Sequence, residues 1–355
     1  QNGASERKAS ETMIKACMFD SKPYDSDSFD KRRSEEISIT YFPVRLDPTT
    51  VSLARGYDVV IVFVNDDLCK EVIDALYEYG VKLIALRCAG FNNVDVKEAY
   101  GKIHIVRVPA YSPEAVAEHT AALLLTSVRH IHKAYNRTRD FNFSIAGLVG
   151  FNLNQKTVGV IGTGRIGKAF INICRGFGMK VLAYDMHPVE GIGAEYVSLD
   201  ELYRRSDVIS LHCPLTEENH HMINAETIAK MKDGVVILNT SRGSLIDANA
   251  LLDGIKSKKI GAAGLDVYEE ETDLFFEDKS GQILQDDTLI RLLSMPNVII
   301  TSHQAFLTDE ALDSIARTTL TNITDFMAGK TIDNEICYHC MHMNDCRKER
   351  KQRCF

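Results

Sequence analysis

The sequence lacks any long hydrophobic run, because no stretch reaches the roughly 18 consecutive apolar residues that a membrane-spanning helix needs. Its first residues, QNGASERKASET, also lack the apolar centre of a secretion signal. An excess of basic residues is missing too, since 49 acidic residues outnumber 41 lysines and arginines and give a formal net charge of −8. These absences argue against a membrane protein and against nucleic acid as a partner.

Paired cysteine spacings are missing from the body of the chain. There are nine cysteines in total, and five of them are scattered among apolar segments: Cys17, Cys69, Cys88, Cys174 and Cys213. An odd number without pairing is typical of free thiols in a reducing compartment. We therefore expect a cytoplasmic protein without structural disulfides.

Strand-like and helix-like segments alternate along nearly the whole chain of 355 residues, a length that favours two domains. The expected strands lie at 14–20, 37–42, 58–64, 82–87 and 104–108, and then at 156–162, 180–185, 207–212, 234–239, 261–267 and 297–302. This alternation is typical of parallel sheets covered by helices. The sequence predicts an α/β fold with two doubly wound parallel-sheet domains.

Two long helices are expected outside the regular alternation. Residues 112–135 form one continuous helical pattern, with Ser112 placed to cap it and Pro113 in its first turn. It is expected to lead from the first domain to the second. The last helix begins at about residue 309 and is expected to return to the first domain.

A glycine motif, GTGRIG, spans residues 162–167. Alone this pattern is weak, but here it follows an apolar strand, opens a helix and is followed 18 residues later by Asp185 at the end of the next strand. Glycines in this arrangement let a backbone turn approach a pyrophosphate, and the carboxylate accepts hydrogen bonds from a ribose. Asp185 would repel a 2′-phosphate, so NAD is favoured over NADP.

Candidate reactive side chains follow three later strands. Arg242 lies in NTSRGS after one strand, Asp266 and the acidic run 269–271 follow the next, and His303 follows the third. Arginine can bind a carboxylate or polarise a carbonyl, and histidine can donate a proton near neutral pH. Arg242 could equally be an ordinary surface arginine. Together the three segments indicate an NAD-dependent carbonyl reductase or alcohol dehydrogenase that acts on an anionic substrate.

Many segments in order resemble the D-isomer-specific 2-hydroxyacid dehydrogenases, and among them the fermentative D-lactate dehydrogenases of bacterial type. They include RCAGFNNVD (87–95), VRVPAYSPEAVAEHT (106–120), VGVIGTGRIG (158–167), DVISLHCPLT (207–216), LNTSRGSLID (238–247), LDVYEEE (265–271), DLFFEDKS (273–280) and TSHQAFLT (301–308). The resemblance implies Rossmann-like or flavodoxin-like domains with an active-site cleft between them. It places a catalytic domain at 13–110 plus 306–336 and an NAD-binding domain at 111–305.

The resemblance also implies roles for individual residues. Arg242 matches the arginine that binds and polarises the substrate, His303 the proton donor and Glu271 the carboxylate partner of that histidine. Substrate-binding positions are Ala89, Gly90, Tyr111, Arg242 and Phe306. Positions that line the NAD site are Gly162, Gly164, Arg165, Ile166, Gly167, Asp185, Cys213, Pro214, Asn219, Thr240, Ser241 and Asp266. No metal is assigned to this site.

The reaction implied by the resemblance is pyruvate + NADH + H⁺ ⇌ D-lactate + NAD⁺, and the implied assembly is a homodimer or homotetramer. Two alternatives stay open. The substrate could be glyoxylate, hydroxypyruvate or a larger 2-keto acid, since pocket volume changes specificity only modestly. The chain could also be a nucleotide-sensing regulatory protein, although such a protein needs no proton donor.

The tail at 337–355, CYHCMHMNDCRKERKQRCF, departs from the family pattern. Cys337 and Cys340 begin like a zinc knuckle, and further ligands are available from His339, His342, Cys346 and Cys354. The remaining spacings match no standard zinc site. A solvated basic tail with oxidisable thiols is expected, with a metal site or an interaction or redox role as alternatives.

Overall fold

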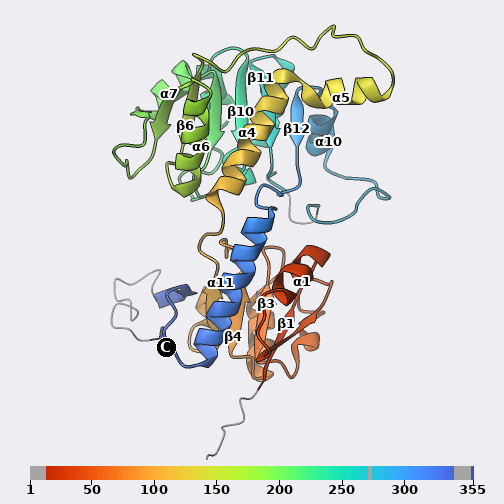
Figure 1. Ribbon diagram of the computed structural model, residues 1–355, viewed down its shortest axis with the longest axis vertical. Helices are drawn as coiled ribbons and strands as arrows, with labels where there is room; N and C mark the ends of the chain where they lie inside the picture. Colours follow the sequence, from red (N-terminus) through yellow and green to blue (C-terminus); the bar gives the residue numbers. More distant parts are fainter. Residues whose placement is uncertain (1–12, 271–273, 340–352) are drawn as a thin grey trace, which may run out of the picture. The chain divides into compact units, whose positions relative to one another are not determined.

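The structure, a computed structural model, describes residues 13–270, 274–339 and 353–355. The chain divides into two compact units: unit 1 comprises Gln1–Ser112 with Thr308–Phe355, and unit 2 comprises Pro113–Leu307. Each unit is built on its own sheet with helices packed against it (Figure 1). The prediction of two parallel-sheet α/β domains is confirmed.

Unit 1 contains a six-stranded sheet in the order β13-β5-β4-β3-β1-β2. The strands are β1 (Ile14–Met18), β2 (Ile37–Tyr41), β3 (Val59–Val62), β4 (Leu83–Leu86), β5 (His104–Arg107) and β13 (Glu335–Ile336). All neighbours pair in parallel except β13, which is antiparallel to β5. Its helices are α1 (Pro23–Asp30), η1 (Val51–Ala54), α2 (Lys70–Glu78), α3 (Val96–Ala99) and α11 (Asp309–Met327).

The last helix completes the core of unit 1. Leu320, Ile323 and Phe326 of α11 pack with Val59 and Leu83 of the sheet in one buried cluster. At its first turn, Ser28 of α1 donates a hydrogen bond to the carbonyl oxygen of Leu312 at 2.9 Å. One face of this sheet is therefore covered by a segment that lies far away in the sequence.

Unit 2 contains a seven-stranded parallel sheet in the order β12-β11-β10-β9-β6-β7-β8. The strands are β6 (Thr157–Ile161), β7 (Lys180–Tyr184), β8 (Glu195–Tyr196), β9 (Val208–Leu211), β10 (Val235–Asn239), β11 (Ile260–Leu265) and β12 (Val298–Ile300). The helices are α4 (Pro113–Arg129), α5 (Ile131–Arg139), α6 (Arg165–Gly176), α7 (Leu199–Arg205), α8 (Ala225–Lys230), η2 (Gly243–Leu245), α9 (Ala248–Lys256) and α10 (Asp287–Ser294).

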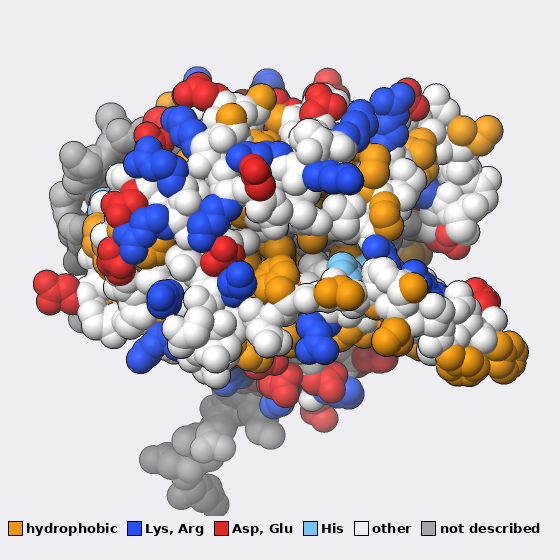
Figure 2. All heavy atoms as spheres, turned by 90° about the horizontal axis from the view of Figure 1, so that it is seen from above, with side chains coloured by type: hydrophobic (Ala, Val, Ile, Leu, Met, Phe, Trp, Pro, Cys, Tyr) orange, Lys and Arg blue, Asp and Glu red, His pale blue; other side chains and the backbone are white. Residues whose placement is uncertain are grey.

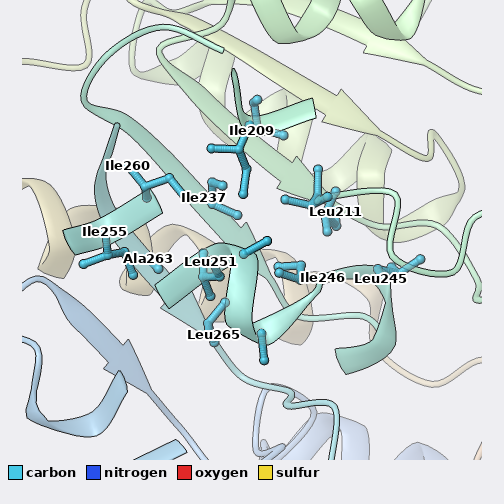
Figure 3. Packing of buried hydrophobic residues seen from close by; sticks show 14 of the residues in the cluster. Ile209, Leu211, Ile237, Leu245, Ile246, Leu251, Ile255, Ile260, Ala263 and Leu265 are labelled. Atoms are coloured by element: carbon cyan, nitrogen blue, oxygen red, sulfur yellow. The ribbon is translucent and has the colours of Figure 1, made fainter. Parts of the chain in front are cut away.

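Helices cover both faces of this sheet. On one face, Leu124 of α4 and Phe170 of α6 pack against Val160 and Leu238. On the other face, Leu251 of α9 packs with strand residues of β9, β10 and β11, and Figure 3 shows this cluster. Because both faces are buried, the strands read as unbroken apolar runs, and this pattern made them predictable.

The helix predicted for residues 112–135 is wrong in one respect. His130 adopts a left-handed conformation with φ of 54°, and this residue separates α4 from α5. Neither glycine nor proline marks the break, so no residue pattern predicts it. None of the helices in the described ranges is both long and apolar enough to span a membrane.

Candidate active site

The turn between β6 and α6 is shaped by its glycines. Gly162 has φ of +94°, and a Cβ there would lie 2.6 Å from the backbone of His212 and of Cys213. A Cβ on Gly167 would lie 2.0 Å from the carbonyl oxygen of Gly162, so neither position accepts a larger residue without movement. Gly164 precedes the first helical residue and has open space around it. The turn therefore leaves its backbone accessible to a pyrophosphate, and the residues fit a dinucleotide.

Helix α6 begins at Arg165, followed by Ile166, and its first turn carries no acidic side chain. Unpaired N–H groups at a helix start favour an anion, and a cationic side chain at the first position adds to this attraction. The start of α6 is thus electrostatically suited to phosphate groups.

Asp185 follows β7 and lies beside the same turn. Its carboxylate accepts hydrogen bonds from the backbone N–H of Thr163 at 2.6 Å, from the Thr163 hydroxyl at 3.0 Å and from the N–H of His187 at 2.8 Å. Partial burial raises the pKa of Asp185, but these hydrogen bonds outweigh it and lower the pKa below the usual range. Asp185 is therefore an anion held next to the glycine turn.

The loop after β9 is ordered by an asparagine. Asn219 donates to the carbonyl oxygen of Pro214 at 2.7 Å and accepts from the N–H of Thr216 at 2.7 Å. Burial raises the pKa of Cys213 in this loop to about 11, so the thiol stays neutral. A neutral side chain is compatible with an adjacent anionic dinucleotide.

Arg242 lies in a turn at the end of β10. The buried Asn239 holds the turn, since its amide donates to the carbonyl oxygen of Arg242 at 2.8 Å and its side-chain oxygen accepts from the N–H of Ser241 at 3.0 Å. A Cβ on Gly243 would lie 2.0 Å from the carbonyl oxygen of Tyr268, so the turn packs tightly on the segment after β11. The Arg242 side chain is half-buried, and one guanidinium nitrogen donates to the carbonyl oxygen of Ser241 at 2.7 Å.

Thr240, the residue before this turn, is also held in place. Its hydroxyl lies 2.8 Å from that of Thr120 on α4, and both side chains are buried. This contact joins α4 to the end of β10, so packing on α4 helps to hold the turn that carries Arg242.

Asp266 organises the segment that carries His303. Its carboxylate is fully buried and accepts hydrogen bonds from the Thr301 hydroxyl at 2.5 Å and from the N–H groups of Gln304 at 2.9 Å and Ala305 at 2.8 Å. The N–H of His303 donates to the carbonyl oxygen of Asp266 at 2.7 Å. The hydrogen bonds of Asp266 thus go to the protein itself, and its influence on the site is exerted through this segment.

His303 has a left-handed backbone with φ of 52°, unusual for a residue other than glycine. Its half-buried ring lies 5.8 Å, between centroids, from the ring of Phe276. Because β10, β11 and β12 are parallel neighbours, Arg242, Asp266 and His303 come from the same edge of the sheet. Phe306 is buried just beyond, and Glu271 lies outside the described residues.

The other predicted substrate residues belong to unit 1. Ala89 and Gly90 lie in the half-buried loop after β4, where Arg107 donates to the carbonyl oxygen of Ala89 at 2.8 Å. Tyr111 lies near the end of the first segment of unit 1. The base of the loop is anchored by the buried Arg87, which forms an ion pair with Asp25 at 3.0 Å. Backbone N–H groups in a loop fixed this way can bind a carboxylate.

The last three residues of the tail, 353–355, pack on unit 1, in contrast to the solvated tail that was expected. Cys354 is buried, and its N–H donates to the buried carboxylate of Glu335 at 3.3 Å. The ring of Phe355 stacks on His104 at 4.1 Å, and the Arg353 guanidinium lies 4.3 Å from the centre of the Phe326 ring. Of the possible metal ligands in the tail, Cys340, His342 and Cys346 lie outside the described residues.

Three supporting residues were not identified from the sequence: Thr163, which binds Asp185, Asn239, which holds the Arg242 turn, and His119 of α4. The His119 imidazole lies 3.1 Å from the Thr301 hydroxyl and 3.4 Å from the Asp266 carboxylate. Asn239 is the last residue of one predicted strand and Thr163 directly follows another, and these positions could have marked them. His119 had no such signal, because it lies far from Asp266 in the sequence.

Comparison with known proteins identifies the family to which this site corresponds. The family described as D-isomer specific 2-hydroxyacid dehydrogenase, NAD binding domain, matches residues 121–305. A 2-hydroxyacid dehydrogenase homolog of Haemophilus influenzae is 56% identical over 321 residues, which cover 88% of this chain and 97% of that protein.

Two further relatives match over nearly their whole length. D-lactate dehydrogenase of Escherichia coli is 50% identical over 328 residues, covering 91% of this chain and 100% of that protein. The structure described as the pyruvate reductase of Chlamydomonas reinhardtii matches with a TM-score of 0.86 and 45% identity, covering 90% of this chain and 98% of that one.

Proposed function

The chain belongs to the D-isomer-specific 2-hydroxyacid dehydrogenases and carries their NAD-binding domain, and from this premise we propose that it reduces pyruvate to D-lactate. The observation that carries the proposal is 50% identity to a D-lactate dehydrogenase along that protein's full length. The pyruvate reductase similarity supports the same substrate. The reaction is pyruvate + NADH + H⁺ ⇌ D-lactate + NAD⁺.

Bound NADH supplies the hydride, and the turn at Gly162, the start of α6 and Asp185 are the residues that would hold it. In the proposed mechanism, Arg242 binds the substrate and stabilises negative charge that develops on the carbonyl oxygen. His303 donates the proton to that oxygen, and Glu271 is its proposed carboxylate partner. The tight packing of Gly243 and the hydrogen bonds of Asp266 hold these two groups in place.

The substrate carboxylate is proposed to bind the backbone of Ala89 and Gly90, with Tyr111 and Phe306 beside the short side chain. Domain roles follow: the catalytic domain, predicted at 13–110 plus 306–336, corresponds to unit 1, and the NAD-binding domain, predicted at 111–305, corresponds to unit 2. Support comes from the Arg107 and Arg87 contacts, which fix the loop after β4 without occupying its N–H groups.

We also propose a homodimer or homotetramer. Four apolar side chains after α5 are highly exposed: Phe141 (84%), Phe143 (74%), Ile145 (81%) and Val149 (87%). Figure 2 shows hydrophobic side chains gathered on a projecting part of the surface. Apolar groups exposed together favour burial against a second copy, and light scattering of the purified protein tests this.

A reducing cytoplasm is the proposed location. Cys17 and Cys174 are buried free thiols, and burial raises the pKa of each to about 12, so neither forms a thiolate readily. Fractionation of cells that express the natural protein tests this placement.

The deciding experiment follows NADH oxidation with pyruvate, in parallel with glyoxylate, hydroxypyruvate and longer 2-keto acids. The expected result is rapid turnover with pyruvate. The product should be detected by an assay that is specific for D-lactate. Faster turnover with another keto acid would refute the substrate while keeping the chemistry. Tight NADH binding without turnover of any acid would refute the enzymatic proposal.

A further inference from the structure

Three side chains that can bind a metal converge in unit 2, and none of the three takes part in the proposed mechanism. The ligand atoms of His220, His221 and Glu269 all lie within 4.8 Å of one another. His221 forms an ion pair with Glu269, and the two imidazole rings stack with centroids 3.9 Å apart and planes inclined by 30°. The cluster joins residues 48 apart in the sequence, so spacing alone did not reveal it.

The backbone explains how two consecutive histidines share one side. Neighbouring side chains in extended backbone point to opposite sides, but His221 adopts a left-handed conformation with φ of 53°. Its N–H donates to the carbonyl oxygen of Ser244 at 2.9 Å, and its own carbonyl oxygen accepts from the Asn224 amide at 2.9 Å. These two hydrogen bonds hold His221 in its strained conformation, which directs both imidazoles towards Glu269.

The contact between His221 and Glu269 does not explain the position of the His220 side chain. That side chain is exposed and makes no hydrogen bond or ion pair with the described residues, yet its ring stacks on the histidine that binds Glu269. A cation shared by the three groups would use all of them at once.

We propose that His220, His221 and Glu269 bind one divalent transition-metal ion of the zinc class. Two imidazole nitrogens and one carboxylate oxygen form a recurrent three-ligand set for zinc, with water as the fourth ligand. At bond lengths of about 2.0–2.1 Å, tetrahedral ligand atoms lie roughly 3.3 Å apart. The widest separations, up to 4.8 Å, therefore need to contract by about 1.5 Å at most, within reach of the exposed His220 side chain, and the close His221–Glu269 pair needs to move apart slightly.

The surroundings favour a cation. Glu217 and Glu218 precede the histidines, Glu270 follows Glu269, and all three are exposed. Such a concentration of negative charge attracts a divalent ion and raises its local concentration. The bound ion would fasten the loop after β9 to the segment after β11.

The test measures Zn²⁺ and Ni²⁺ binding to the full chain by calorimetry, with neither NADH nor substrate present. Wild type should bind one more ion per chain than His220→Ala, and Glu269→Gln should weaken binding about 10–100-fold or more, since even outer-sphere changes cost that much. His187→Ala, which removes another exposed histidine of unit 2, should bind like wild type. Excess Mg²⁺ should not compete, because it prefers oxygen ligands.

Zinc ligands in the tail would contribute equally to all of these proteins, so only the difference between variants bears on the cluster. Equal stoichiometry and affinity in wild type and His220→Ala would overturn the proposal, as would the absence of zinc binding to wild type. Zn²⁺ should also raise the unfolding temperature of wild type more than that of His220→Ala. None of these readouts depends on turnover, so they stand apart from the proposed activity.

Discussion

Replacing Asp266 with asparagine should destabilise unit 2 and displace the segment that carries His303. The wild-type carboxylate is fully buried and serves the Thr301 hydroxyl and the N–H groups of Gln304 and Ala305. Asparagine keeps one acceptor oxygen but places an NH₂ group where the second oxygen stood. At least one buried donor, such as the N–H of Ala305, then faces another donor.

The size of the effect follows from these contacts. An unsatisfied buried N–H costs about 1–3 kcal/mol, and each hydrogen bond that changes from a charged to a neutral acceptor loses about 1 kcal/mol. With one bond lost and two weakened, the free energy of unfolding should fall by about 3–5 kcal/mol. The exposed Asp253→Asn change on α9 is a matched control and should alter it by less than about 0.5 kcal/mol.

The pH dependence supplies a second check. Burial raises the pKa of Asp266, but hydrogen bonds from His119, Thr301, Ala305 and Gln304 outweigh it, so the pKa is lowered below that of an unfolded aspartate. The carboxylate therefore stabilises the fold above about pH 4 and loses this effect as the pH falls through the folded-state pKa. The difference in free energy of unfolding between wild type and Asp266→Asn should be constant from about pH 5 to 8. It should become smaller at lower pH.

Urea unfolding followed by circular dichroism, with NADH absent, measures these differences. Pyruvate reduction should slow together with the loss of stability, because His303 shares the displaced segment. An unfolding midpoint for Asp266→Asn equal to that of wild type at pH 7 would refute the reasoning. A difference in free energy of unfolding that increases below pH 4 would also refute it.

Three further changes test other parts of the molecule. Arg242→Lys should lower kcat/KM for pyruvate by roughly 100-fold, because an ammonium group cannot form a bidentate pair, and NADH affinity by fluorescence titration should be unchanged. Asp185→Ala should raise the ratio of kcat/KM with NADPH to that with NADH by about tenfold or more, a free-energy change of about 1.4 kcal/mol in transition-state binding, and an unchanged ratio would contradict its role. Burial raises the pKa of Asp66 to about 7. The protonated Asp66 side chain should therefore stabilise unit 1 most below about pH 4, and this stabilisation should fall by up to about 4 kcal/mol as the pH rises to 7. Asp66→Asn should lack this decline in urea titrations, and parallel pH profiles for the two proteins would contradict it.

The sheets were predictable from sequence because their strands are buried on both faces. Residues 235–238 and 59–62 are unbroken apolar runs, and such runs separated by helical patterns indicate parallel strands. The two-residue strands β8 and β13 were missed, since so short a strand leaves no periodic pattern. The break at His130 was missed because its conformation depends on the surrounding structure and not on residue type.

The candidate site was predictable in position more than in contacts. The glycine turn, Asp185 and Arg242 each lie at or just after the end of a predicted strand, and parallel strands bring their carboxyl ends to one edge. Sequence could not show that the Asp266 carboxylate binds the segment after β12, because these hydrogen bonds depend on the path of residues 301–305. Likewise, nothing in the sequence pairs His221 with Glu269. The catalytic roles of Arg242, Glu271 and His303 stay predictions.

The two-part construction of unit 1 has a consequence for how the chain folds during synthesis. Residues 113–307, 195 in number, separate its first segment from α11. At about 5–20 residues per second, the ribosome needs roughly 10–40 s to make that interval, long enough for unit 2 to fold first. Throughout it, the sheet face formed by residues such as Val59 and Leu83 has no Leu320, Ile323 or Phe326 to cover it. The first segment is therefore the part of the nascent chain most exposed to aggregation and most in need of a chaperone.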